Sequence, residues 1–165
     1  GTGLAGAALR NTCDWLEGCD ISAAMLAEAA GKGIYDRLEK RDLGEMALGD
    51  ARFDLIVAAD VFIYLGALER ILGWCAGSLV PGGVLAFTVE EVETASVVLQ
   101  PSRRFAHSRA YLAEVLSAAG FGSARMDTVV LRMDRGEPVR GVIVLAEATR
   151  SGVRRQDDGE GLALA

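Results

Sequence analysis

The segment FDLIVAAD, Phe53 to Asp60, is a near-continuous apolar run that ends on an acid. Such a run is typical of a strand buried on both faces of a parallel sheet. Before and after it, short apolar segments alternate with stretches of helical periodicity. This alternation predicts an α/β protein with right-handed crossovers, in which helices cover both faces of a mostly parallel, Rossmann-like sheet.

Helix signals lie on both sides of this central strand. Ser22 is placed to cap a helix that glycines at 31 and 33 would end, and it follows the short apolar strand candidate LEGCD, residues 16–20. A second strand candidate covers residues 38–43. After the central strand, apolar residues at helical spacing predict a helix over 68–79, which the Pro81-Gly82-Gly83 turn would end before a strand over 84–89.

The last third of the domain predicts a different arrangement. Ser108 and Gly120 bracket a helix, and two strand-like runs follow over residues 124–133 and 139–148. The polar segment DRGEP between these runs predicts an antiparallel hairpin at the end of the sheet. We therefore expect one domain over residues 1–149 and a flexible tail over residues 150–165, where charges and glycine show no period.

Composition excludes several classes of protein. The chain has 165 residues, of which 51% are hydrophobic, and a formal net charge of -6, which argues against a nucleic-acid binder. The three cysteines lack metal-ligand spacing and there is a single histidine, so we expect no metal site. No apolar run reaches the length of a membrane span, and we expect a cytoplasmic protein that does not bind membranes.

The segment GTGLAG, Gly1 to Gly6, has the G-x-G-x-x-G pattern of a loop that lets a nucleotide approach the backbone. Asp20 ends the next strand, where an acid can accept hydrogen bonds from both hydroxyls of a ribose. The helix N-terminus after the loop suits a carboxylate as well as a phosphate. These two features alone permit either a dinucleotide or an amino-acid nucleoside.

Downstream segments decide between these cofactors, because in order and spacing they resemble class I S-adenosylmethionine-dependent methyltransferases over nearly all of the chain to about residue 149. The matching segments are GTG, GCDIS with ML, RDL, FDLIVAADVFIYL, LVPGGVLAFTVE and the AGF that ends a helix. The segment RRFAHSRAYLAEVLSAAGF looks most like small-molecule methyltransferases, including bacterial ones associated with tetratricopeptide repeats. The resemblance implies a seven-stranded sheet whose last two strands form a hairpin.

The resemblance also implies a role for each matching position. Gly1, Thr2 and Gly3 would line the methionine part of the cofactor, and Asp20 would hold the ribose. The remaining positions would contact the adenine or the sulfonium end. They are Ile21, Met25, Asp42 and Leu43 for the adenine, and Asp60 and Val61 for the sulfonium. As alternatives, Ile21 and Met25 are ordinary core residues, and Asp42 is a solvated turn acid.

The family pattern has an acid and another glycine before GTG, on and after a first strand. Neither is present before Gly1, so we expect the domain to be incomplete at its N-terminus. The neighbours of such a central strand would lose a ladder partner and expose apolar surface. A partner chain, including a second copy in a homo-oligomer, or a further segment would then complete the fold.

Methyl transfer requires a nucleophile aligned with the carbon–sulfur bond and protected from water. His107 is the candidate general base, and the alternative is a loop histidine that orients the start of the next helix. Tyr64 is the second candidate, or else an aromatic lid on the cofactor. Arg103 and Arg104 could bind an anionic acceptor, or lie in a solvated loop.

The segment AADVFIY contains no Asn-Pro-Pro-aromatic motif of the kind this family uses on planar amino groups. We therefore expect an enzyme that methylates a small molecule at oxygen, carbon or nitrogen. A nicotinamide-dependent oxidoreductase and a non-catalytic truncated domain remain the alternatives.

Overall fold

The structure is a computed structural model that describes residues 1–93, 95–134 and 136–149. The first half contains α1 (Leu4–Leu9), η1 (Arg10–Thr12), β1 (Glu17–Asp20), α2 (Ala23–Ala30), β2 (Arg37–Lys40), η2 (Leu43–Glu45), β3 (Phe53–Ala58) and η3 (Phe62–Tyr64), where η is a 3-10 helix. The second half contains α3 (Glu69–Ser78), β4 (Leu79–Glu91), β5 (Val97–Leu99), β6 (Phe105–His107), α4 (Arg109–Ala119), β7 (Arg125–Asp134) and β8 (Glu137–Glu147). The tail expected over residues 150–165 lies outside the described residues.

β4 is the strand that holds the larger sheet together. On one edge it pairs in parallel with β3 and, near its carboxyl end, with β6; on the other edge it pairs antiparallel with β8. β7 and β8 form the predicted antiparallel hairpin at one side of the sheet, and β5 extends β6 at the other. The α/β fold and the hairpin are confirmed, but this sheet is mixed rather than mostly parallel.

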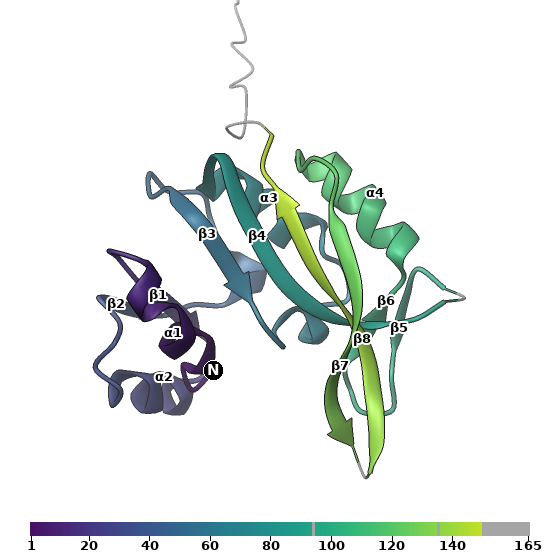
Figure 1. The fold of residues 1–165 in the computed structure, drawn as a ribbon, viewed down its shortest axis with the longest axis horizontal. Coiled ribbons are helices and arrows are strands. Elements are labelled where there is room, and N and C mark those ends of the chain that lie inside the picture. Colours follow the sequence, from purple (N-terminus) through teal and green to yellow (C-terminus); the bar gives the residue numbers. More distant parts are fainter. Residues whose placement is uncertain (94, 135, 150–165) are drawn as a thin grey trace, which may run out of the picture.

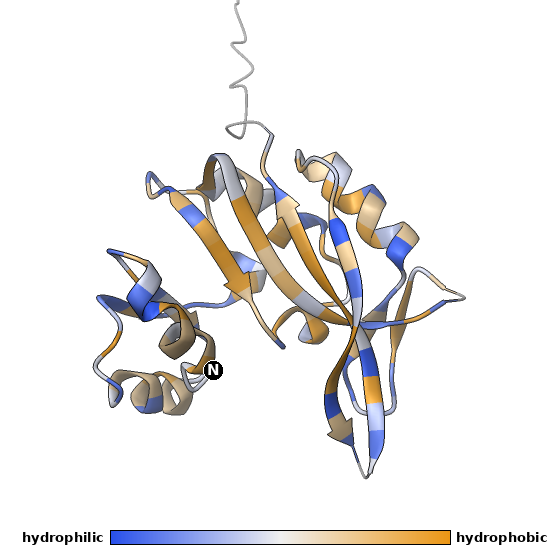
Figure 2. Ribbon diagram, viewed as in Figure 1, coloured by the Kyte–Doolittle hydropathy of each residue, from blue (hydrophilic) through white to orange (hydrophobic). Residues whose placement is uncertain are grey.

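One face of this sheet carries the core. Leu85, Phe87 and Val89 alternate along β4 and are almost fully buried, opposite Val142 and Val144 of β8. The buried sides of α3 and α4 cover this face, since both helices contribute to the same cluster of buried side chains. The orange colouring of β3, β4 and β8 in Figure 2 follows from this need for apolar residues in the inner strands.

The predicted helix ends are confirmed where capping residues mark them. The Ser22 hydroxyl accepts a hydrogen bond from the Met25 N–H, and the Ser108 hydroxyl accepts one from the Tyr111 N–H. Gly120 ends α4 with a φ of 98°, a left-handed conformation that favours glycine.

The Pro81-Gly82-Gly83 segment has the predicted positive φ at Gly82, 81°, but it lies within a strand rather than before one. β4 begins at Leu79, directly after α3, and these three residues lie within the strand as an irregularity in its pairing with β3. Hydrogen bonds from the N–H of Gly82 to the Ala148 carbonyl and from the N–H of Ala148 to the Gly83 carbonyl join this segment to the chain after β8. The turn therefore forms as an irregularity inside β4, and hydrogen bonds to the chain after β8 hold it in the sheet.

β1 and β2 form a separate parallel pair, which lies on the side of β3 away from β4 (Figure 1). Among the described residues, β1 pairs only with β2, and the edge of β3 that faces away from β4 pairs with no strand. Leu55 and Val57 of β3 are 43% and 39% exposed, on the sheet face opposite α3 and α4. Apolar side chains of β3 are therefore accessible on this face.

The two faces of the larger sheet should differ in how strongly they stabilise the fold. We expect Leu85→Ala to lower the free energy of unfolding by about 2–5 kcal/mol, because it leaves a cavity in the buried face. Leu55→Ala, on the open face, should cost less than about 1 kcal/mol. Urea unfolding measures both, and equal losses would show that the exposed face of β3 is covered in solution.

Candidate functional site

The glycine segment meets Asp20 at the carboxyl end of β1. The N–H of Ser22 donates to one carboxylate oxygen of Asp20 at 2.7 Å, and the backbone nitrogen of Gly1 lies against the other oxygen. Partial burial acts to raise the pKa of Asp20, whereas hydrogen bonds from the backbone N–H groups of Ser22 and Ile21 act to lower it. Asp20 is therefore an ionised acceptor at neutral pH, as the binding of ribose hydroxyls requires.

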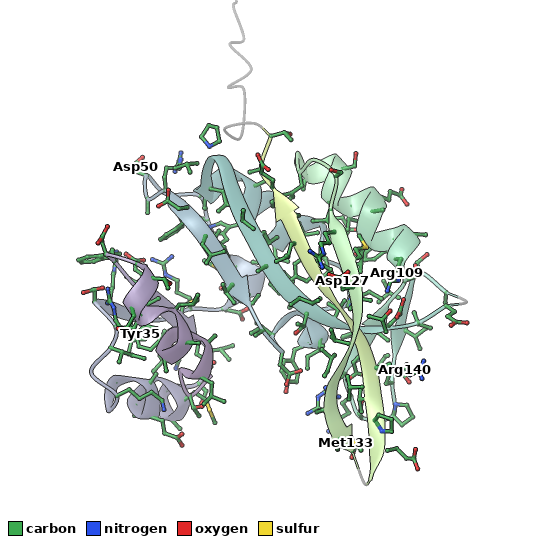
Figure 3. All side chains as sticks on the ribbon, in the orientation of Figure 1. Tyr35, Asp50, Arg109, Asp127, Met133 and Arg140 are labelled. Carbon is green, nitrogen blue, oxygen red and sulfur yellow. The ribbon has the colours of Figure 1, made fainter. Side chains whose placement is uncertain are left out.

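The glycines of this segment are explained in part by a residue that the sequence analysis missed. A Cβ on Gly6 would lie 2.1 Å from the Tyr35 hydroxyl oxygen, and a Cβ on Gly3 or Gly18 would also contact the Tyr35 ring. Figure 3 shows Tyr35 among the elements of the N-terminal half. Gly3 also has a φ of 86°, whereas a Cβ on Gly1 would meet no atom within 4 Å. Gly1 is thus the glycine with open space beside it.

Ile21 and Met25 form an exposed apolar surface next to Asp20. Ile21 directly follows β1 and is 61% exposed, and Met25, in the first turn of α2, is 37% exposed. Neither is an ordinary core residue. An apolar surface beside an ionised carboxylate suits a ligand that has both a flat base and a sugar.

Asp42 and Leu43 are held differently. Asp42 caps η2, where one of its carboxylate oxygens accepts a hydrogen bond from the Gly44 N–H at 2.8 Å. Leu43 is partly buried and packs against the core. The carboxylate is therefore already engaged in its own turn, while the backbone next to it follows the carboxyl end of β2.

A cavity lies elsewhere in the described part of the fold. It has a volume of about 560 Å³ and is lined by Asp42 together with residues at the starts of β1, β2 and β3, among them Glu17, Arg37 and Phe53. The glycine segment and Asp20 do not line it. Of the residues predicted to contact the cofactor, Asp42 alone lines this cavity, so the cavity is not built around the glycine segment.

Asp60 and Val61 lie directly after β3. Asp60 has a φ of 56°, which is uncommon for a residue other than glycine, and its N–H donates to the Thr88 hydroxyl at 2.8 Å. Strained backbone of this kind is frequent at functional sites. Val61 is partly buried and packs against the core.

Tyr64 and Arg104 lie near this strand end. Tyr64 is 60% exposed, and its side chain raises the pKa of the nearby Arg104 guanidinium. Arg103 beside it is exposed and has a φ of 61°. The Tyr64 side chain is therefore accessible to a molecule that binds at the end of β3.

His107 lies in β6, not in a loop as the sequence suggested, and its ring is fully buried. Its Nε2 donates to the Gly66 carbonyl at 2.9 Å, so Nδ1 is unprotonated, and Nδ1 has no partner among the described residues. The ring stacks on Tyr111, with a centroid separation of 5.8 Å. Burial lowers the pKa of His107, so the ring is neutral. His107 directly precedes Ser108, the N-cap of α4, and its role as general base or as a residue that orients the helix start stays a prediction.

A charged cluster joins the carboxyl ends of β3 and β4. Arg132 of β7 forms an ion pair with the buried Glu90, and its other terminal nitrogen lies 3.4 Å from an oxygen of Asp60. The negative charges of Asp60 and Glu90 also raise the pKa of Arg104. The sequence analysis missed Arg132 and Glu90, because no motif links positions so far apart in the chain.

The predicted residues thus form two groups. The first surrounds the carboxyl end of β1, and its members are Gly1, Thr2, Gly3, Asp20, Ile21 and Met25. The second, with Asp60, Val61 and Tyr64, follows β3. Within the described part of the chain, no hydrogen bond or ion pair joins the two groups, no cluster of side chains suits a metal ion, and no helix is long and apolar enough to cross a membrane.

The profile of a family described as "Methyltransferase domain" matches residues 1–87. The chain belongs to this family. The match covers the glycine segment, Asp20, Asp60 and the central strand, which are the features the site was built from. Its fold is that of solved S-adenosylmethionine-dependent methyltransferases.

A curated relative and two solved structures are similar to the methyltransferase domain. The chain is 35% identical over 78 residues to the malonyl-[acyl-carrier protein] O-methyltransferase of Enterobacter lignolyticus (strain SCF1), which covers 47% of the chain and 31% of the relative. Magnesium protoporphyrin IX methyltransferase from Synechocystis PCC 6803, with bound S-adenosylmethionine, superposes with a TM-score of 0.66 at 20% identity, covering 90% of this chain and 66% of that one. The putative methyltransferase of Haloferax volcanii, in complex with the activator Trm112, superposes with a TM-score of 0.72 at 21% identity. The match covers 91% of this chain and 80% of that one.

These similarities confirm the family and the fold but not the finer assignment. The methyltransferase domain spans less than a third of its curated relative, and the solved structures are distant enough to show the fold alone. The tetratricopeptide-repeat-associated subgroup and the individual site residues stay predictions.

The buried His107 should make stability depend on pH. Since its pKa is lowered in the folded state, the unfolded state binds the proton more readily, and the stability that the neutral ring contributes is lost as pH falls below about 6.5. We expect the free energy of unfolding to fall more for the wild type than for His107→Gln between about pH 7.5 and about pH 5. Urea unfolding measures this difference. An equal fall in the free energy of unfolding of both proteins would contradict a neutral, buried His107.

Proposed function

We propose that this domain transfers a methyl group from S-adenosylmethionine to a small-molecule acceptor at oxygen, carbon or nitrogen. The observation that carries the proposal is the carboxyl end of β1, where the ionised Asp20 lies between the glycine segment and the exposed Ile21 and Met25. These groups match the parts of the cofactor in order: an amino-acid moiety, a ribose and a base. Bound there, the cofactor supplies an electrophilic methyl group on its sulfonium.

Each residue then has a task in binding. Gly1, Thr2 and Gly3 admit the methionine part, and Asp20 accepts hydrogen bonds from the ribose hydroxyls. Ile21 and Met25 cover the adenine, and Asp42 with the Leu43 backbone approaches its edge. Asp60 and the Val61 backbone lie at the sulfonium end, after the strand that leads from the core to the site.

The acceptor would be bound at the end of β3. Tyr64 is exposed there, with Arg104 near its side chain, so this pair can orient an acceptor and exclude water from the transfer. His107 acts through the Gly66 carbonyl, which it fixes two residues after Tyr64. An acceptor that is already ionised, or that loses its proton readily, needs no base from the protein.

A small-molecule acceptor is supported by the negative net charge and by the named substrate of one relative of the fold. The net charge of -6 disfavours binding to a phosphate backbone. Magnesium protoporphyrin IX, in the name of the Synechocystis enzyme, is a small molecule. Incubation with methyl-labelled S-adenosylmethionine and a cell extract tests the proposal. Label should enter the low-molecular-weight fraction, whereas label confined to protein or nucleic acid would contradict it.

Asp20 offers the most direct test of cofactor binding. We expect Asp20→Asn to weaken the binding of S-adenosylmethionine by at least about tenfold, because it removes a charged acceptor of two hydrogen bonds. Asp14→Asn, at an exposed acid that precedes β1, is the matched control and should leave the affinity unchanged. Calorimetry measures both. Binding of NADH in preference to S-adenosylmethionine would instead favour the oxidoreductase alternative.

The open edges of β1 and β3 predict that a further strand strengthens binding. A polypeptide that supplies an apolar strand ahead of Gly1 would pair both edges and fix the two groups of site residues relative to each other. We expect it to bind S-adenosylmethionine more tightly than the present chain. Equal affinities in calorimetry would count against this proposal, and a dimer that binds as tightly would show that a second copy fills the gap.

A further inference from the structure

The hairpin of β7 and β8 brings a positive charge to the carboxyl ends of β3 and β4. The pairing of β7 with β8 shifts register between Val130 and Arg132. Such an irregularity changes the direction in which the following side chains point. Arg132 is only 21% exposed, and its two terminal nitrogens reach Glu90 and Asp60.

Two carboxylates and two guanidiniums make up this cluster. Glu90 is 7% exposed and has Arg132 as its ion-pair partner, whereas Asp60 is about half exposed. The pKa of Arg104 is raised by the Tyr64 side chain and by the negative charges of the same two carboxylates. Without Arg132, one buried and one exposed carboxylate would be balanced by Arg104 alone.

We propose that Arg132 is a positioning residue that sets the charge beside the sulfonium, and thereby the preference of the domain for S-adenosylmethionine over S-adenosylhomocysteine. The inference rests on the proposed function, which places the sulfonium end of the cofactor at Asp60. The substrate carries a positive sulfur and the product an uncharged one. Carboxylates at this position favour the charged form, and a neighbouring guanidinium reduces that preference.

The consequence is a balance between binding the substrate and releasing the product. A site with uncompensated carboxylates would hold the sulfonium in its ground state. Only interactions that strengthen in the transition state accelerate transfer, and the positive charge on sulfur is lost during the reaction. Arg132 limits the ground-state attraction while keeping Asp60 in place.

The ratio of the two dissociation constants tests this proposal by calorimetry. We expect Arg132→Gln to increase the preference for S-adenosylmethionine over S-adenosylhomocysteine by about three- to tenfold, because one positive charge is removed. Arg132→Lys, which keeps the charge, should retain the wild-type ratio. Arg140→Gln is the matched control, because Arg140 is exposed on β8 of the same hairpin (Figure 3) and should leave the ratio unchanged.

If Arg132 only held the hairpin against Glu90 and did not affect the charge at the sulfonium, the result would differ. Arg132→Gln would then weaken both ligands equally and lower the melting temperature, with no change in the ratio, and the proposal would be wrong. Should this variant fail to fold, Asp60→Asn provides the opposite test, since it should lower the preference for the charged ligand by about threefold. An unchanged ratio in Asp60→Asn would also overturn the proposal.

The same titrations separate this proposal from the proposed function. Binding of neither compound by the wild-type chain would contradict the proposed function itself. Binding of both, with a ratio that no charge change in the cluster alters, would contradict only the role of Arg132.

Discussion

The pairing of β4 with strands on both of its edges is the constraint on which the rest of the structure depends. Its buried residues, Leu85, Phe87 and Val89, fix the face that α3 and α4 cover. Its pairing with β3 determines where Asp60 emerges, and its own carboxyl end supplies Glu90. The hairpin that carries Arg132 is attached through β8. Packing of one strand thus positions the acceptor side of the site.

The cofactor side is organised by a different contact. Tyr35 fills the space that Gly3, Gly6 and Gly18 leave open, and so holds the glycine segment near β1. Asp20 then lies at the end of β1 with its carboxylate ionised. Because β1 and β3 do not pair with each other, the two sides of the site are built from separate sheets, and methyl transfer requires that they be held together.

Local signals in the sequence predicted much of this arrangement. The apolar run before Asp60, the capping serines at 22 and 108, and Gly120 all act through nearby backbone, so their effects could be read from neighbouring residues. Placement after strand ends also located Asp20 and Asp60. The short strands β5 and β6 were not predicted, because three residues carry too little periodicity.

Features that depend on distant contacts could not be predicted. His107 precedes a capped helix in a polar segment, and only its pairing within the sheet buries it. Arg132 is 72 residues from Asp60 in sequence, and the bond between them requires the register shift in β7. Tyr35 has no local pattern that links it to the glycines it contacts. In each case tertiary packing decides the role of a residue whose neighbours in sequence are uninformative.

A crystal structure of the protein with S-adenosylhomocysteine measures the central claim most directly. The account predicts a ribose on Asp20, an amino-acid moiety beside Gly1 and a sulfur atom directed toward Asp60. A nucleoside found instead in the cavity at the amino ends of β1, β2 and β3, with the Asp20 carboxylate free of ligand, would contradict it.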